Sequence, residues 1–380
     1  MDFSLQIVKQ ALLNEAKQGF GKNFACSPLS VATMLSMLTA GTDEHGLKDF
    51  LSSLGCKSMD ELNSKSLELM NVASSKGSWK PGDPLLSVAN GCWVDQRYSL
   101  KPLFKETLQS IYKVESKAMD FENKGDEVVD EVNSWVNNET KGLIQGILDS
   151  SEDLDMLKII LANALYFKGT WNPIFDVSDT SDKNFYLLNG EEVKAPFMYQ
   201  EYGYEQYGSF EGFKVLRLPY QNEQDQRRFS MYIYLPDERD GLKNLLQQLN
   251  PNPEEFLKHQ LMLEPKIMSY FWIPKFKFSC RFQVSQVMQE LGLKEPSIML
   301  CSPHGQEFPA SASINHKAVI EVNETGTEAA AVTDLYCGCS LDAPPPVPPF
   351  VADHPFVFMI MEDESRIPLF VGAVVNPLLG

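Results

Sequence analysis

Residues 321–331 read EVNETGTEAAA, and the chain continues from there to Ser340 without a proline. Because successive side chains of a strand point to opposite faces, residues 327–340 as a strand would place both of their carboxylates, Glu328 and Asp334, on one face. The opposite face would carry uncharged and mostly small side chains: Thr327, Ala329, Ala331, Thr333, Leu335, Cys337 and Cys339. The lack of proline also keeps every backbone N–H available for a sheet. The pattern is compatible with a strand that enters a packed sheet, and the alternative is a flexible, alanine-rich loop.

The segment around this stretch, residues 325–349, differs from the rest of the chain in composition. It begins with small residues and ends in prolines at positions 344, 345, 346, 348 and 349. Structureless connections of this length are uncommon in compact domains and are usually functional or disordered. Cys337-Gly338-Cys339 lacks the second cysteine pair of a zinc site, so we favour a plain loop over metal binding or redox cycling. Pro346-x-x-Pro349 fits a ligand of SH3 or WW domains, but such matches are frequent by chance.

Composition limits the classes of partner. Of the 380 residues, 43% are hydrophobic, so a large core is available, and the formal net charge is −18. An acidic surface repels phosphates, so we expect neither nucleic acid nor an anionic membrane as a partner. No apolar run reaches the ~18 residues of a membrane span.

The N-terminal residues and the cysteines bear on location. The start, MDFSLQ, has neither the basic nor the apolar region of a signal peptide. The seven cysteines are odd in number and scattered, which argues against a disulfide framework and for a reducing compartment. We therefore expect a cytoplasmic protein, with the nucleus as a further location, and a monomer.

Hydrophobic periodicity predicts an α+β fold. Helical spacing marks residues 3–12 and 126–138, and Ser27-Pro28 is an N-cap followed by a first-turn proline that predicts a helix ending at Gly41. Helices cluster early and strands late, which favours mostly antiparallel sheets. The runs of strand length are residues 85–94, 158–167, 229–235, 356–361 and 369–375, the last two separated as in a hairpin.

Catalytic and cofactor motifs are missing from the sequence. There is no Gly-x-Ser-x-Gly elbow, P-loop, dinucleotide glycine fingerprint or His-Glu-x-x-His helix. The five histidines are far apart and none forms a pair with metal-ligand spacing: His45, His259, His304, His316 and His354. We expect no enzyme activity, no cofactor and no metal.

Five stretches together resemble the serpins, the serine protease inhibitor family. Residues 321–331 are similar to the serpin hinge. Residues 23–38 (NFACSPLSVATMLSML) resemble the early buried helix, and residues 161–171 (LANALYFKGTW) resemble the central strand. Residues 351–356 (VADHPF) and 368–377 (PLFVGAVVNP) resemble the C-terminal signature. The resemblance covers the chain in the right order, and the signal-free start with VADHPF is similar to the plant intracellular branch.

The resemblance implies a single domain, residues 1–380, of three mainly antiparallel sheets and about nine helices. It also implies an exposed reactive-centre loop with its hinge, residues 324–350, that a target endopeptidase cleaves. The protease would form a covalent acyl-enzyme, and the cut loop would insert into the central sheet before water releases the protease. The hinge residues implied are Glu324, Gly326, Thr327, Glu328, Ala329, Ala330 and Ala331.

The family pattern also implies where the loop is cut. The scissile residue of inhibitory members lies sixteen positions after the hinge glutamate, which gives Ser340-Leu341 here. At ~3.3 Å per residue, residues 327–340 would span ~46 Å when extended. The prolines lie after this bond, on the fragment that does not insert. Leu341 could itself occupy the primary pocket of a papain-like protease if the cut moves to Leu341-Asp342.

The resemblance also implies two polar clusters of the family, which can be assigned to individual residues of this sequence. The shutter, where the sheet opens, is implied at Ser27, Ser30, Asn163 and His316. The breach, at the top of the sheet, is implied at Trp171, Lys275 and Glu324, with the lysine and glutamate paired. The plainer alternatives are an N-cap for Ser27, a satisfied core histidine for His316, and a surface ion pair of ~0–1 kcal/mol for the breach.

The sequence also departs from the family pattern. Val332 is bulkier than usual, although it lies on the outward face, and the proline run replaces residues that normally pair as a strand after the cut. Cys339-Ser340-Leu341 is not a common bait. We therefore expect an inhibitor of serine or papain-like cysteine proteases, and the alternative is a non-inhibitory binding or storage protein with the same fold.

Overall fold

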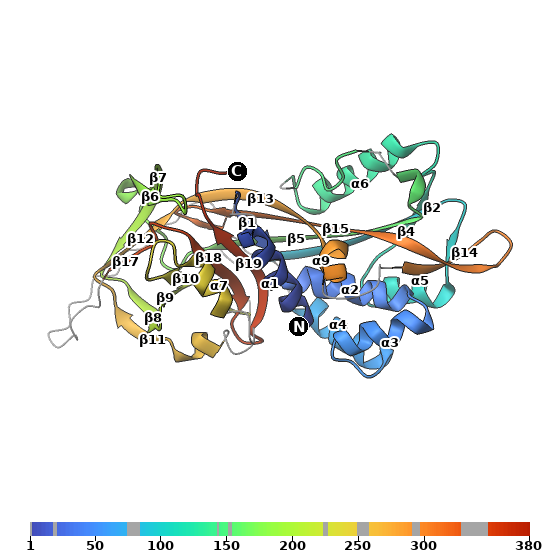
Figure 1. Ribbon diagram of the computed structural model, residues 1–380, viewed down its shortest axis with the longest axis horizontal. Helices are drawn as coiled ribbons and strands as arrows, with labels where there is room; N and C mark the ends of the chain where they lie inside the picture. The colour runs from blue at the N-terminus through green and yellow to red at the C-terminus, as the bar shows by residue number, and fades with distance from the viewer. Residues whose placement is uncertain are drawn as a thin grey trace.

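The computed structural model describes residues 2–17, 21–73, 84–142, 144–150, 154–222, 227–248, 258–290, 297–327 and 349–380. Figure 1 shows an elongated molecule in which a long central sheet runs between helix α6 on one face and a group of N-terminal helices on the other. The remaining two sheets lie toward one end. The reactive-centre residues 328–348, including the implied cut, fall outside the described residues.

Three sheets are present in the described part of the chain, as the resemblance implied. The central sheet has the order β3-β14-β15-β5-β2-β4, with β13 paired to β15 and β16 paired to β5. Its strands are β2 (Leu85–Asp95), β3 (Ser99–Leu100), β4 (Ser116–Met119), β5 (Ile159–Thr170), β13 (Phe276–Gln283), β14 (Ser297–Cys301), β15 (Glu307–Val322) and β16 (Gly326–Thr327).

The other two sheets pack at the end of the molecule where the hinge lies. A four-stranded sheet has the order β17-β12-β7-β6, and a seven-stranded sheet has the order β1-β19-β18-β10-β9-β8-β11. Their strands are β1 (Phe24–Cys26), β6 (Ser181–Tyr186), β7 (Glu192–Glu201), β8 (Tyr204–Phe210), β9 (Phe213–Pro219), β10 (Phe229–Pro236), β11 (Glu264–Ile267), β12 (Tyr270–Pro274), β17 (Phe350–Val351), β18 (Phe356–Glu362) and β19 (Ile367–Val374).

Eight α-helices lie within the described residues, where the resemblance implied about nine. They are α1 (Asp2–Lys17), α2 (Pro28–Gly41), α3 (Glu44–Ser53), α4 (Met59–Ala73), α5 (Pro102–Ser110), α6 (Gly125–Glu139), α7 (Leu242–Gln248) and α9 (Val284–Glu290). Short 3-10 turns occur at Leu154–Met156, Val177–Asp179 and Lys258–Met262. None of the described helices is both long and apolar enough to cross a bilayer.

Most elements predicted from periodicity are confirmed. The helices expected at residues 3–12, 28–41 and 126–138 are α1, α2 and α6, and the five expected strands are β2, β5, β10, β18 and β19, the last two paired as a hairpin. The Ser27 hydroxyl accepts the Ser30 N–H at 3.1 Å and thus caps α2, as Ser-Pro predicts. The 15-residue helix α4 and the shorter helices α3, α5, α7 and α9 were not predicted.

The centre of the large sheet combines an antiparallel and a parallel strand pair. β5 pairs antiparallel with β2, but it pairs parallel with β15 from Ile159↔Ala312 to Leu165↔Ala318. β5 is covered on both faces: its odd-numbered side chains join the main core and its even-numbered ones pack with Val128 and Val132 of α6. A strand inserted between β5 and β15 and antiparallel to both would therefore replace one parallel pair by two antiparallel pairs.

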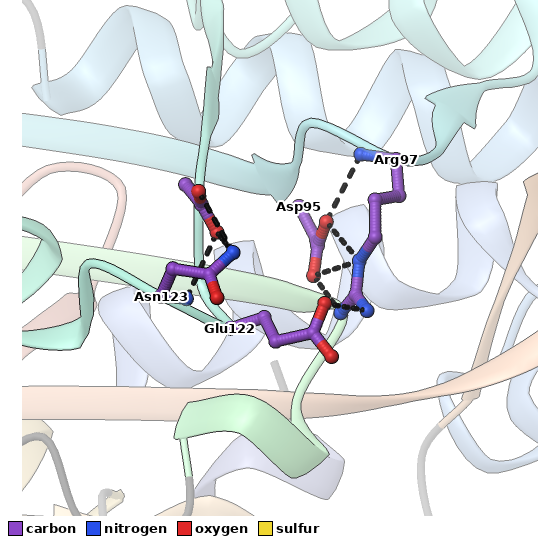
Figure 2. A network of polar contacts seen from close by, with 5 residues as sticks. Asp95, Arg97, Glu122 and Asn123 are labelled. Atoms are coloured by element: carbon purple, nitrogen blue, oxygen red, sulfur yellow. Dashed lines mark hydrogen bonds and ion pairs between the residues drawn. The ribbon is translucent and has the colours of Figure 1, made fainter.

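Helix α6 is anchored to the end of this sheet that lies far from the hinge. Figure 2 shows Arg97, just after β2, donating to the carboxylate of Asp95 at 2.6 Å and to Glu122 at 2.5 Å. Asp95 is buried, which raises its carboxyl pKa, but the hydrogen bonds from Arg97 outweigh this and hold the pKa below its usual value. The contacts join the turn after β2 to the segment that leads from β4 into α6.

Candidate functional site

The hinge begins with a tight reversal at the end of β15. Asn323 and Gly326 exchange two backbone hydrogen bonds, of 3.0 and 3.1 Å, and the Asn323 side chain accepts from Thr325. Gly326 has φ +143°, and a Cβ on it would lie 2.0 Å from the carbonyl oxygen of Gly169. Since both the backbone angle and the close approach exclude a side chain, glycine is required here.

After this turn the chain is already part of the central sheet. Gly326 and Thr327 form β16, which pairs antiparallel with Thr170 and Gly169 of β5. Thr327 is 3% exposed, and its hydroxyl lies 2.9 Å from the hydroxyl of Tyr220. The face of Thr327 is thus the face turned toward the main core.

The breach residues lie together around this turn. Trp171 donates its indole N–H to the Asn323 carbonyl at 2.8 Å and its backbone N–H to the Thr325 carbonyl at 2.9 Å. The Lys275 ammonium contacts both carboxylate oxygens of Glu324 at 2.9 Å, and the Thr180 hydroxyl donates to the same carboxylate at 2.8 Å. The side chains of Trp171, Thr180 and Lys275, from three separate parts of the chain, therefore hold the hinge in place.

The Lys275–Glu324 pair is not a fully exposed surface contact. Glu324 is 6% exposed as a residue, whereas the Lys275 side chain is 34% exposed. Burial raises the carboxyl pKa of Glu324, but the hydrogen bonds from Lys275 and Thr180 outweigh it, so the pKa lies below its usual value. Glu324 is therefore ionised at neutral pH, which the ion pair requires.

The shutter residues also meet, in the middle of the sheet. Ser27, Ser30, Asn163 and His316 are all 0% exposed. The Ser27 N–H donates to His316 Nε2 at 3.3 Å, and Asn163 and His316 stand opposite each other on β5 and β15. Ser27 therefore does both: its hydroxyl caps α2, and its backbone N–H bonds to His316.

Three polar atoms of the shutter lack hydrogen-bond partners among the described residues. They are Ser30 Oγ, Asn163 Oδ1 and His316 Nδ1. Burial lowers the pKa of His316 to about 4, against a smaller opposing effect of the Asn163 backbone carbonyl, so the ring is neutral at pH 7. Since its Nε2 accepts a hydrogen bond, Nδ1 carries the proton, and no hydrogen bond of good geometry forms to it in the described structure. A buried polar atom in this state costs about 1–3 kcal/mol.

A cavity lies between the hinge and the shutter. Its volume is about 210 Å³, and its lining includes Leu165 and Phe167 of β5, Val319 of β15 and Thr327. It occurs where the β5–β15 pairing ends, at Leu165↔Ala318, and before the β5–β16 pairing begins at Gly169. The two strands have therefore begun to separate at the hinge end.

Several residues of this region were not found from the sequence. Tyr220 stacks on Trp171 with ring centroids 4.5 Å apart and contacts Thr327, and Asn90 accepts from the Asn163 side chain at 2.7 Å. No local pattern marks either residue, because each contributes a single side chain from a distant part of the chain. Other implied residues lie outside the described part: Glu328, Ala329, Ala330, Ala331, Ser340 and Leu341.

In the described part of the chain, no three histidine, cysteine, aspartate or glutamate side chains gather as they would around a metal ion. The described residues place three features along one line of the central sheet: a hinge that pairs with β5, a cavity ahead of it, and a polar cluster short of partners beyond.

Comparison with known proteins agrees with this description. The sequence model of a family described as "Serpin (serine protease inhibitor)" matches residues 1–377. The chain is 42% identical to Serpin-ZX of Arabidopsis thaliana, over 99% of this chain and 98% of that protein. It is 41% identical to Serpin-Z2B of Triticum aestivum, over 94% of this chain and 90% of that protein.

A solved structure described as "Structure of Arabidopsis AtSerpin1. Native Stressed Conformation" is similar to this fold with a TM-score of 0.83 at 40% identity, and the match covers 100% of this chain and 99% of that one. The family match and the relatives near 40% identity cover almost the whole chain. The chain therefore belongs to the serpin family, whose members are generally protease inhibitors, and it resembles the plant serpins in particular.

Proposed function

We propose that this serpin inhibits serine or papain-like cysteine endopeptidases as a suicide substrate. The protease nucleophile attacks the carbonyl carbon of Ser340, an acyl bond to the enzyme forms, and the Ser340–Leu341 peptide bond breaks with a proton passing to the new amino group of Leu341. Insertion of the cut loop into the central sheet then precedes hydrolysis of the acyl bond. The protein itself catalyses nothing in this scheme.

The observation that carries the proposal is the pairing of β16 with β5. If the antiparallel register of Gly326↔Thr170 and Thr327↔Gly169 continues, each further residue of the loop moves one residue back along β5. The twelve residues of β5, Ile159–Thr170, would then receive residues 326–337. Residues 338–340 would remain as a short tether to the acyl bond at the far end of the sheet.

The shutter supports the same path. In this register Thr333 would lie opposite Asn163, and its hydroxyl would reach the cluster in which three polar atoms lack partners. Residues 329, 331 and 333 would face the main core, where the loop sequence carries alanine or threonine. Insertion would thus bury uncharged side chains and offer a hydroxyl to unsatisfied groups.

The test is incubation with a panel of elastase-like, chymotrypsin-like and papain-like proteases, followed by denaturing electrophoresis. A covalent complex that survives denaturation is expected for at least one of them. If the proteases of the panel cut the loop but none forms a covalent complex, the non-inhibitory binding or storage protein would be favoured instead. We favour papain-like targets, because residues 335–342 contain no Arg or Lys for a trypsin-like pocket and because we expect a cytoplasmic location.

The position of the cut follows from the C-terminal fragment released when a trapped complex is denatured. A fragment starting at Leu341 is expected, and one starting at Asp342 would move the cut by one residue. A cut after Tyr336 leaves ten residues from Thr327, or ~33 Å of reach, so enzymes that cut there should degrade the inhibitor. A stable complex with a fragment starting at Cys337 would contradict the length requirement.

A further inference from the structure

Aromatic side chains gather on one part of the four-stranded sheet. Trp272 of β12 stands directly opposite Tyr199 of β7, and the centroids of their rings are 4.4 Å apart. The ring of Tyr270, also in β12, lies 6.1 Å from that of Tyr199. The ammonium of Lys183 in β6 lies 3.7 Å from the centre of the Trp272 ring. All four residues are half-buried, so each keeps a part that a partner could contact.

The turn that follows β7 adds two tyrosines that are far more exposed. Tyr202 is 68% exposed and Tyr204 is 71% exposed. The Tyr202 N–H donates to the carbonyl of Ser269 at 3.2 Å, which holds the turn beside the start of β12 at Tyr270. Tyr202 has φ +53°, a left-handed conformation that strains a tyrosine and that glycine adopts freely. A large aromatic side chain is therefore held in solvent at a position where glycine would fit without strain, which points to a function.

These five residues, Tyr199, Tyr202, Tyr204, Tyr270 and Trp272, form what we call the aromatic patch. Tyrosine and tryptophan dominate the energetics of protein–protein interfaces, because they offer a large contact area and lose little conformational entropy when bound. The chemistry of the patch therefore suits a protein partner.

The charges beside the patch indicate the chemistry of that partner. Glu201 and Asp179 are both exposed. Burial raises the pKa of Tyr199, and the carboxylates of Glu201 and Asp179 raise it further, so both charges lie close to its ring. Tyrosine and tryptophan rings also attract cations to their faces, as Trp272 does with Lys183. A partner surface with lysine or arginine side chains would complement both the carboxylates and the rings.

Both described ends of the reactive-centre segment attach at β12. Before the segment, Glu324 is bonded to Lys275, which directly follows β12. After the segment, β17 pairs in parallel with β12 at Phe271↔Phe350 and Trp272↔Val351. Figure 1 shows β7, β8, β12 and β17 together at one end of the molecule. A protease that holds the segment between these two attachments must therefore lie over the end that carries the aromatic patch.

We propose that the aromatic patch is a docking surface for the target endopeptidase, which contacts it with a basic surface beside its active-site cleft while the cleft holds the loop. The proposal deepens the function proposed above and rests on recognition of the loop by a protease, but not on insertion or trapping. It assigns target selectivity to residues outside the loop. Among proteases that accept the same bond, those with a basic surface at this place bind faster and more tightly.

The experiment measures binding without cleavage. Each protease of the panel is prepared with its nucleophile replaced by alanine, and its affinity for the intact protein is measured by surface plasmon resonance. The test variant combines Tyr202→Gly with Tyr204→Thr, because glycine suits the left-handed turn and threonine suits a strand. The matched control combines Leu103→Ser with Met156→Ser, which removes two side chains that are 74% and 73% exposed in α5 and in the turn before β5.

We expect the test variant to bind at least one protease of the panel roughly tenfold more weakly than the wild type does, with an unchanged melting temperature. The control variant should bind like the wild type. Glu201→Gln should reduce the dependence of the association rate on salt concentration, because it removes one of the charges that attract the partner.

Equal affinities of the test variant and the wild type for every protease of the panel would overturn docking at the patch. Equal losses in the test and control variants, or no measurable binding of the wild type to any panel member, would overturn it as well. None of these outcomes requires a covalent complex. A failure to trap active protease would refute the proposed inhibition, and the affinity comparison would still decide the docking surface.

Discussion

The hinge end and the middle of the central sheet differ in strand pairing and in how well their buried polar groups are hydrogen-bonded. At the hinge end β5 and β15 are apart, and the polar groups of the breach are satisfied by Lys275, Thr180 and the Trp171 indole. In the middle the strands are paired, yet three buried polar atoms of the shutter have no partner in the described structure. The strands are thus apart at the hinge end, where the polar groups have partners, and paired in the middle, where three polar atoms lack them. This difference favours entry of a strand from the hinge end.

Cutting the loop should remove this difference, and it is the largest effect we expect. Cleavage within residues 333–341 should raise the melting temperature by tens of degrees, because a strand of up to twelve residues gains two antiparallel neighbours and the shutter gains a hydroxyl. Calorimetry of intact and cleaved protein measures it. Equal melting temperatures would mean that the middle of the sheet stays closed, as in a non-inhibitory serpin.

Blocking entry at the hinge should come next in size. Thr327→Arg puts a charge at a position 3% exposed beside Tyr220, which costs several kcal/mol without a partner. The variant should become a substrate, cut and released with little or no covalent complex. Thr327→Val, of similar volume and uncharged, should still trap protease. Trapping by Thr327→Arg at the wild-type stoichiometry would refute entry at this point.

The middle of the sheet should respond to acid through His316. Its folded pKa, about 4, lies below the unfolded value of ~6.5, so the unfolded chain binds the extra proton first. The contribution of neutral His316 to the free energy of unfolding should therefore be fully present above pH ~6.5. The free energy of unfolding of the intact protein should fall by about 3 kcal/mol as the pH drops to ~4. Urea unfolding from pH 4 to 7 should show this slope in the wild type and in His304→Gln, an exposed position, but less of it in His316→Gln.

The smallest effect should come from the ion pair at the breach. Glu324→Gln should lower the stability of the intact protein at pH 7 by about 1 kcal/mol, a modest value because Lys275 remains a third exposed. The folded pKa of Glu324 is depressed, so its contribution is present above the unfolded value of ~4.3 and is lost as the pH falls through the folded one. The two proteins should thus converge below pH ~4.3. A difference that persists there would point to packing instead of charge.

Features with local constraints could be predicted from the sequence alone. The N-cap at Ser27 depends on neighbours a few residues away and is confirmed, whereas the alternation of small side chains in residues 327–340 stays a prediction. The long strands β2 and β5 were recognisable because buried strands are continuous apolar runs. The resemblance to serpins then named the shutter and breach residues, but their roles in inhibition stay proposals.

What the sequence could not give is which distant side chains meet, since this depends on sheet order and register across the whole chain. His316 contacts Ser27 across 289 positions and Trp171 contacts Asn323 across 152. The tertiary structure alone placed Tyr220 beneath Thr327 and set Asn163 opposite His316. It also decided that β5 and β15 run parallel, so that one strand placed between them could be antiparallel to both. Local composition thus predicts a segment with strand-like alternation, and only the packing of the whole chain determines which strands lie on either side of the hinge.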